Sequence, residues 1–276
     1  MNPDRYIRIF DVINLLVQHK EGLRLTEIKS ELNLPVSSVH NMLQAMIDAE
    51  LATVNEDLRY SVGPRAVALA LRTLQSLDIR SVARRHLQDL VKEIGDDVYL
   101  AIKIGNRVIY ADRCLGTQRI SLDIRLGESL FLHSTATGKL FAALDSKLGA
   151  HAMVSKLVKI TPNTISNAKD LELEFQRIRT QGYAKSNGES MEGIQGYSVP
   201  IYDGAGALTA ALHVSVLQKR ATKSHERKLL DCARACAEQI ERQLGNYDES
   251  TTRLTKARPA DVAGNLKSRT LHRLAA

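Results

Sequence analysis

The sequence predicts an α+β protein that begins with a winged helix-turn-helix, continues through a linker helix and ends with an antiparallel sheet domain. Three observations support this order. Apolar residues recur at helical spacing in three short N-terminal segments, and two strand segments follow them. Residues 64–94 keep helical spacing. Beyond residue 97 the period changes to two, and Gly105-Asn106 and Asp203-Gly204 separate pairs of strands.

The N-terminal elements follow from periodicity and breakers. Residues 6–19 form an amphipathic helix, and a second helix starts at Leu25-Thr26-Glu27, with Thr26 as its expected N-cap. Asn33-Leu34-Pro35 ends that helix, and a third helix begins near Ser37. The strands LATV and RYSV flank a turn at residues 55–57. This order is typical of a winged helix-turn-helix.

The C-terminal elements alternate between strands and helices. VYLAIKI and RVIYAD predict a hairpin, RISLDIRL predicts a strand over residues 119–126, and SVPIY pairs with LTAALHVSVL. DLELEFQRIRTQG predicts a helix that Gly182 ends, and residues 222–244 predict a closing helix. The last residues, from Asn246, are polar, basic and aperiodic, so we expect a mostly disordered tail.

Composition limits the class of protein. The 276 residues suffice for two domains. No apolar run or leader pattern predicts a membrane span or secretion, and three cysteines make no disulfide framework, so we expect a cytoplasmic protein. The net charge is +7, but residues 1–80 hold 9 basic and 10 acidic residues. DNA binding by that part must therefore rest on local geometry instead of bulk charge.

The segment HSTATGK, residues 133–139, allows several interpretations. A phosphate-binding loop needs a glycine where His133 stands and a hydroxyl residue where Leu140 stands. A hydrolase or transferase site would use His133, Ser134 and Lys139, but the segment lacks a nucleophile elbow. Lys139 is more often a solvated or helix-packed lysine in such a setting. Ser134 or Thr135 as a helix N-cap is the third interpretation.

Five segments, in this order and spacing, make the chain resemble the IclR family of bacterial transcriptional regulators over residues 4–245. They are LTEIKSELNLPVSSVHNML, RYSVGPR, FLHSTATGKLFAA, QGYAKSNGE and GIQGYSVPIYDGAGAL. The resemblance implies a DNA-binding domain at residues 1–63, a linker helix at 64–80 and a GAF-like effector-binding domain at 81–245. The basic tail would then be residues 246–276. It also implies a homodimer or tetramer that binds a double-stranded operator and a small metabolite. The residues themselves show no metal-ligand spacing, no paired acid/base constellation and no membrane-spanning run, so we expect no metal, cofactor, catalytic residues or membrane association.

The third predicted helix and its surroundings supply the candidate DNA contacts. Serine and asparagine can donate to and accept from base edges, and helix N-termini and arginines can hold phosphate. Where the family usually has a basic residue and an arginine, this chain has Val36 and Asn41, which predicts a shallow dependence of binding on salt. Solvated surface positions, and helix capping for Ser37, are the alternatives. The candidates are Thr26, Ser37, Ser38, His40, Asn41, Arg59 and Arg65.

The resemblance places the effector site at the N-terminus of the helix that HSTATGK begins. Unpaired N–H groups there favour a carboxylate, so a small organic acid is the expected effector. Gly196 replaces a frequent family cysteine, and Ser186 replaces a family acid. Core positions are the alternative for Leu122, Leu130 and His213. The full candidate set is Leu122, Leu130, Ala136, Thr137, Gly138, Ser186, Gly196, His213 and Ser215.

Overall fold

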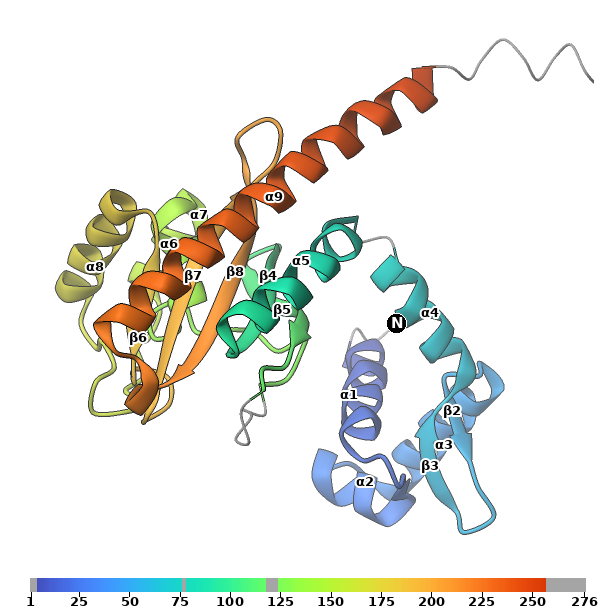
Figure 1. Cartoon of the computed structure of the whole chain (residues 1–276). Coiled ribbons are helices and arrows are strands. Elements are labelled where there is room, and N and C mark those ends of the chain that lie inside the picture. Colours follow the sequence, from blue (N-terminus) through green and yellow to red (C-terminus); the bar gives the residue numbers. More distant parts are fainter. Residues whose placement is uncertain (1–3, 76–77, 118–123, 257–276) are drawn as a thin grey trace, which may run out of the picture. The chain divides into compact units, whose positions relative to one another are not determined.

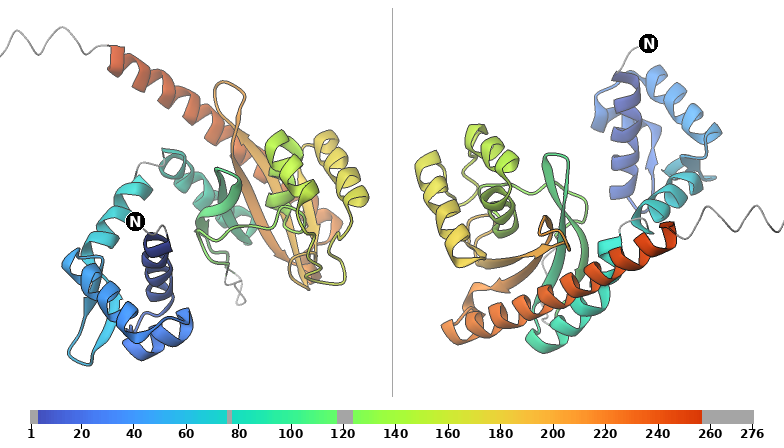
Figure 2. Two further views of the ribbon diagram at one scale, coloured as in Figure 1. Left: turned by 180° about the vertical axis from the view of Figure 1, so that it is seen from behind. Right: turned by 90° about the horizontal axis from the view of Figure 1, so that it is seen from above.

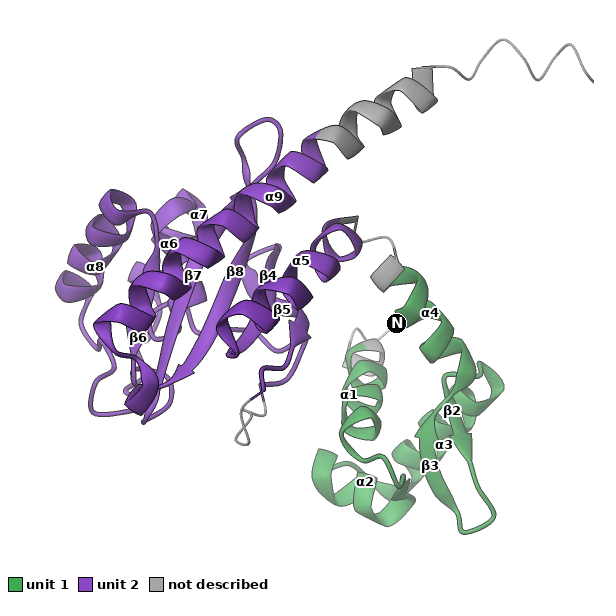
Figure 3. Ribbon diagram, in the orientation of Figure 1, with its two compact units in different colours: residues 1–77 green, residues 78–276 purple. Residues whose placement is uncertain are grey.

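The computed structural model describes residues 4–75, 78–117 and 124–256 (Figure 1). The chain forms two compact units, Met1–Leu77 and Asp78–Ala276 (Figure 3). The predicted linker at residues 64–80 crosses this boundary. No helix in the described ranges is long and apolar enough to span a membrane.

The first unit has the predicted order of helices and ribbon. Its elements are α1 (Asp4–Gln18), β1 (Leu23–Arg24), α2 (Leu25–Leu32), α3 (Val36–Asp48), β2 (Ala52–Val54), β3 (Arg59–Val62) and α4 (Pro64–Gln75). The strands form an antiparallel sheet in the order β1-β3-β2. Its core is built by apolar residues of the first three helices, among them Val12, Leu16, Ile28, Val39, Leu43 and Met46.

The break between α2 and α3 occurs where the sequence predicts it, but the caps differ. Asn33 adopts a left-handed conformation and ends α2. The N-cap of α2 is Arg24, not Thr26, and the Arg24 backbone N–H donates to Glu27 Oε2 at 2.7 Å. Pro35 is the N-cap of α3, so Ser37 lies inside the helix and caps nothing. Pro35 has φ −61° and ψ 141°, which is the extended conformation that an N-cap adopts.

The second unit is a five-stranded antiparallel sheet between two helical layers. Its elements are α5 (Asp78–Ile94), β4 (Asp97–Ile104), β5 (Arg107–Cys114), α6 (Ala136–Leu144), α7 (Ser146–Val154), α8 (Ala168–Gln181), β6 (Ala184–Asn187), β7 (Ile194–Tyr202), β8 (Leu208–Leu217), the 3₁₀ turn η1 (Gln218–Arg220) and α9 (Lys223–Lys256). The strand order is β5-β4-β8-β7-β6. Figure 2 shows α5 and α9 on one face of the sheet and α6, α7 and α8 on the other.

Two predictions about this unit need correction. Residues 124–126 do not form a strand, and the remainder of the predicted strand, residues 118–123, lies outside the described residues. The helix α9 continues to Lys256 instead of ending at 244. The prediction of a disordered tail that begins at residue 246 is therefore wrong. No proline occurs between residues 223 and 258, so proline does not end the helix in this range. Residues 257–276 lie outside the described part.

Candidate functional site

The exposed face of α3 is the candidate DNA interface. Ser37, Ser38, His40 and Asn41 are all exposed. The opposite face packs Val39, Met42, Leu43 and Met46 into the core of the first unit. Burial of one face at three- and four-residue spacing therefore fixes which side chains α3 presents outward.

The other predicted DNA-contact residues differ in exposure and in the contacts that their side chains already make. Thr26 and Arg65 are exposed, in the first turns of α2 and α4. Arg59 is half-buried, and its guanidinium donates to the Gly22 carbonyl at 3.0 Å and lies 3.8 Å from Glu27 Oε2. The guanidinium therefore ties the ribbon to the turn before β1.

The tip of the β2–β3 wing is acidic. Asn55 Oδ1 accepts the Arg59 backbone N–H at 2.8 Å, which closes the turn. Glu56 and Asp57 are exposed at the tip, and Leu58 has a φ of 58°. Two carboxylates at this point would oppose a phosphate backbone, so α3 must supply most of any specific contact.

Four of the predicted effector residues, Ser186, Gly196, His213 and Ser215, share the face of the sheet that α6 covers. Residues directly opposite in an antiparallel sheet point to the same face. Ser186, Gly196, Ser215 and Asp97 form one such row across β6, β7, β8 and β4. The next row on that face contains Ser198, His213 and Tyr99. An ideal Cβ built on Gly196 would lie 3.4 Å from the Cβ of Ala136, which brings α6 directly over these rows.

A chain of hydrogen bonds links α6 to three strands. Tyr110 Oη lies 3.2 Å from Thr137 Oγ1, which lies 2.7 Å from Ser198 Oγ, which in turn lies 3.1 Å from His213 Nδ1. All four residues are buried. Tyr110 and Ser198 were not among the residues that the sequence indicated. The period of two marks Ser198, which is two residues after Gly196 and therefore on the same face, whereas Tyr110 carries no such signal.

Two buried hydroxyls beside this chain are unused. Ser134 Oγ and Ser215 Oγ have no hydrogen-bond partner among the described residues. Ser186 Oγ donates to the Ser134 carbonyl at 2.8 Å, so β6 is fastened to the segment that precedes α6. A buried hydroxyl without a partner is costly, and a polar ligand atom would remove that cost.

The N-cap of α6 is one of the two residues that the sequence predicts. Thr135 is the N-cap, and its Oγ1 accepts the Gly138 N–H at 2.9 Å. A Cβ on Gly138 would lie 2.2 Å from the Phe131 carbonyl oxygen, so this glycine admits the preceding loop and not a ligand. Leu130 is half-buried and packs on the apolar core. Leu122 lies outside the described residues.

Burial changes the chemistry of His213. Desolvation by burial lowers the pKa of its imidazole to about 3, so the ring is neutral near pH 7. His213 can exchange hydrogen bonds with a ligand, but it offers no positive charge to an anion.

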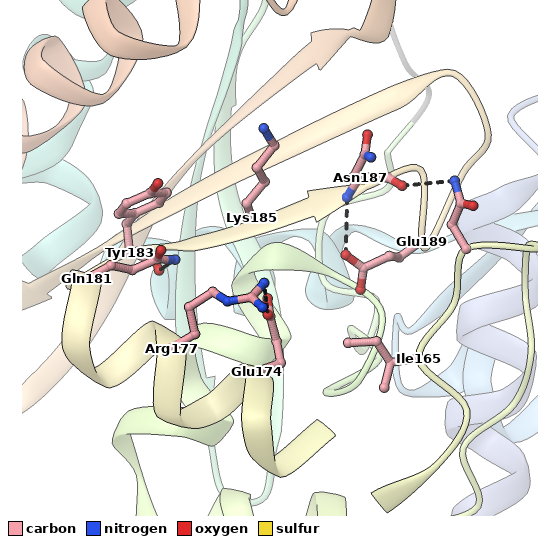
Figure 4. A pocket seen from close by; sticks show the side chains of 9 residues that line it. Ile165, Glu174, Arg177, Gln181, Tyr183, Lys185, Asn187 and Glu189 are labelled. Carbon is pink, nitrogen blue, oxygen red and sulfur yellow. Dashed lines mark hydrogen bonds and ion pairs between the residues drawn. The ribbon is translucent and has the colours of Figure 1, made fainter. Parts of the chain in front are cut away.

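Lys139 is fully buried, so the expectation of a solvated lysine is wrong. Its Nζ donates to Glu174 Oε1 at 3.0 Å and to both carboxylate oxygens of Glu189 at 2.8 Å. Arg177 Nη1 donates to the second oxygen of Glu174 at 3.1 Å. Glu174, Arg177 and Glu189 line a cavity of about 410 Å³. Figure 4 shows their side chains around it. Because these carboxylate oxygens already have partners, the cluster is a structural ion network joining α6, α8 and the loop after β6.

The same contacts argue against the hydrolase or transferase interpretation. His133 Nε2 lies 2.9 Å from the Val158 carbonyl oxygen, and the Lys139 ammonium is held by two carboxylates. Ser134 Oγ has no hydrogen bond to either side chain. A serine nucleophile needs a base within hydrogen-bond reach, and neither neighbour supplies one in this arrangement.

Comparison with known proteins gives the family. Residues 71–242 match the bacterial transcriptional regulator IclR C-terminal family, and residues 7–56 match the IclR helix-turn-helix domain. The regulator KdgR of Dickeya chrysanthemi is 24% identical over 245 residues, which cover 88% of this chain and 80% of KdgR.

Solved structures agree with this result. The IclR structure from Thermotoga maritima is 30% identical, with a TM-score of 0.74, covering 88% of this chain and all of that one. An IclR homologue from Microbacterium hydrocarbonoxydans, solved with 4-hydroxybenzoate, shares the fold at 22% identity and a TM-score of 0.76, with 87% of this chain and 97% of that one covered. With both family domains present in order, the chain belongs to the IclR family of bacterial transcriptional regulators.

Proposed function

We propose that this regulator binds a small organic acid in its second unit and that this binding changes its affinity for an operator. The observation that carries the proposal is the pair of buried, unpartnered hydroxyls, Ser134 and Ser215, beside the hydrogen-bonded chain under α6. A core selected only for stability gains nothing from them, whereas a ligand with two polar ends would satisfy both.

The carboxylate class follows from the local electrostatics. The first N–H groups of α6, at Ala136 and Thr137, have no partner within the helix and carry the positive end of its dipole. Asp97, the acid in the first row, already accepts the Gly116 N–H at 2.6 Å, and Ser186 brings no charge. The complex of the Microbacterium homologue with 4-hydroxybenzoate, itself a carboxylate, supports the same class.

Titration calorimetry with matched acids and amides tests this class. 4-Hydroxybenzoate and 4-hydroxybenzamide are the first pair, and other small acids with their amides follow. We expect at least one acid to bind more tightly than its amide, and Ser215→Ala to weaken that acid. Equal binding of acid and amide across the panel, or a cationic amine as the best ligand, contradicts the proposal.

A homodimer or tetramer fits the surface of the first unit. Ile7, Phe10 and Val17 on α1 are 59%, 66% and 63% exposed, and they follow helical spacing along one stripe. Such a stripe favours burial against a second copy, which would place two α3 helices on a palindromic operator. Because the operator is part of the bacterial chromosome, the protein would act in the cytoplasm. Light scattering on Phe10→Ser tests the interface: a smaller assembly than wild type supports it, and an unchanged one contradicts it.

A further inference from the structure

The outermost stripe of α3 carries no positive charge. Residues 37, 41, 44 and 48 are spaced by three or four, so they lie along one line of the helix, opposite the buried residues. They are Ser37, Asn41, Gln44 and Asp48, and all four are exposed. None of the thirteen residues of α3, Val36–Asp48, is lysine or arginine.

This composition decides which bases the helix can recognise. Guanine is read mainly by arginine or lysine at its O6 and N7 atoms, whereas adenine is read by the amide of asparagine or glutamine at N6 and N7. Two amides one turn apart, with no cation between them, suit adenines and do not suit guanines.

Gln44 is held in a defined orientation. Its Nε2 donates to Asp48 Oδ1 at 3.2 Å. The amide keeps a second N–H and its carbonyl oxygen, which are the donor and the acceptor that adenine N7 and N6 require. Asp48 therefore fixes which end of the amide faces outward, and it also repels phosphate from the C-terminal end of α3.

We infer that Asn41 and Gln44 together read adenines in each operator half-site, so that A·T pairs specify the contacts of α3. This rests on the proposed operator binding and adds its base specificity. Gln44 was not among the residues that the sequence indicated. The span from Asn41 to Gln44 is about 4.5 Å along the helix axis, which suits adjacent or nearly adjacent base pairs.

Selection of binding sites from random duplexes, with the full chain, tests the inference. We expect adenine at two positions in each half-site. Asn41→Ala should abolish the preference at one position and Gln44→Ala at the other, each with roughly a ten- to hundredfold loss of affinity for the selected site. Gln176→Ala removes an exposed amide from the second unit and should change neither.

A gain-of-function variant gives a second test of the inference. Asn41→Arg should change the preferred base at its position from adenine to guanine and steepen the dependence of binding on salt. Guanine at the positions that Asn41→Ala or Gln44→Ala affects, or unchanged preferences in both variants, overturns the inference while operator binding stands. A wild-type chain that selects no duplex at all overturns operator binding as well.

Discussion

Gly196 and His213 occupy one space between β7, β8 and α6. A Cβ on residue 196 would lie 2.7 Å from His213 Cε1, so the imidazole fills the volume that a side chain there would need. The resemblance to the family indicates only that Gly196 stands where a cysteine is frequent. In the structure, the absence of a side chain at Gly196 leaves space for the imidazole of His213. The two positions therefore set the shape of the proposed effector site together.

Gly196→Ala should consequently destabilise the second unit by about 1–3 kcal/mol through overpacking. Combining it with His213→Ser should recover part of that loss, because the smaller side chain vacates the space. Denaturant unfolding of the four proteins in this double-mutant cycle measures the coupling. Additive effects would show that the two residues do not compete.

His213 also predicts a pH dependence. Its pKa is about 3 when folded and about 6.5 when exposed. Between these pH values the unfolded chain binds more protons than the folded chain. The free energy of unfolding is therefore not reduced by His213 above pH 6.5, and it falls as the pH drops from 6.5 towards 3. The decline is at most about 1.4 kcal/mol per pH unit. His213→Gln should flatten the stability profile in this window, and an unchanged slope would mean that His213 is not the group responsible.

The charge of Lys139 is needed because two buried carboxylates face it. Lys139→Met leaves Glu174 and Glu189 without their shared cation and should cost about 3–5 kcal/mol. Lys147, exposed in the first turn of α7, is the matched control, and Lys147→Met should stay within about 0.5 kcal/mol of wild type. Thermal or denaturant unfolding compares them. Similar small losses in both variants would contradict the ion network.

At the scale of the element, α6 depends on its cap. Thr135→Ala removes the acceptor of the Gly138 N–H and should cost about 0.5–2 kcal/mol, while Thr135→Ser, which keeps the hydroxyl, should cost less. If the helix positions the effector's acid group, Thr135→Ala should also weaken binding of the acid more than binding of its amide. If binding of the acid and of its amide weakens equally, the N-cap of α6 has no specific role in recognition of the acid group.

The elements that the sequence predicted well are those with local causes. Asn33-Leu34-Pro35 and Gly182 end helices through backbone preferences that act within a few residues, and strand alternation marks β7 and β8. The short strands β1 and β6 were missed because two and four residues carry too little periodicity. The burial of Lys139 was missed because its partners are 35 and 50 residues away in the sequence.

The residues of the candidate sites also differ in whether a local sequence pattern predicts them. Exposure of Ser37, Ser38, His40 and Asn41 follows from the amphipathic pattern of α3, which the sequence displays. The polar chain of the second unit depends on strand register, which brings Ser198 opposite His213, and no short-range pattern reveals that pairing. The internal bond of Arg59 depends likewise on a turn 37 residues away.

At the scale of the whole molecule, the chain joins a DNA-reading unit to a unit with a buried polar cluster. Regulation requires that ligand binding to one unit change the equilibrium of the other, and such a coupling is reciprocal. Coupling free energies of this kind are typically about 1–3 kcal/mol, which corresponds to a change of roughly 5- to 150-fold in affinity.

The most direct test of the central claim measures the affinity of the full chain for its selected operator at fixed salt, with and without the acid found by calorimetry. The acid should change the dissociation constant by roughly 5- to 150-fold, its amide should change it far less, and Ser215→Ala should reduce the acid's effect. The operator should change the affinity for the acid by the same factor. An operator affinity that no bound carboxylate alters would contradict the account.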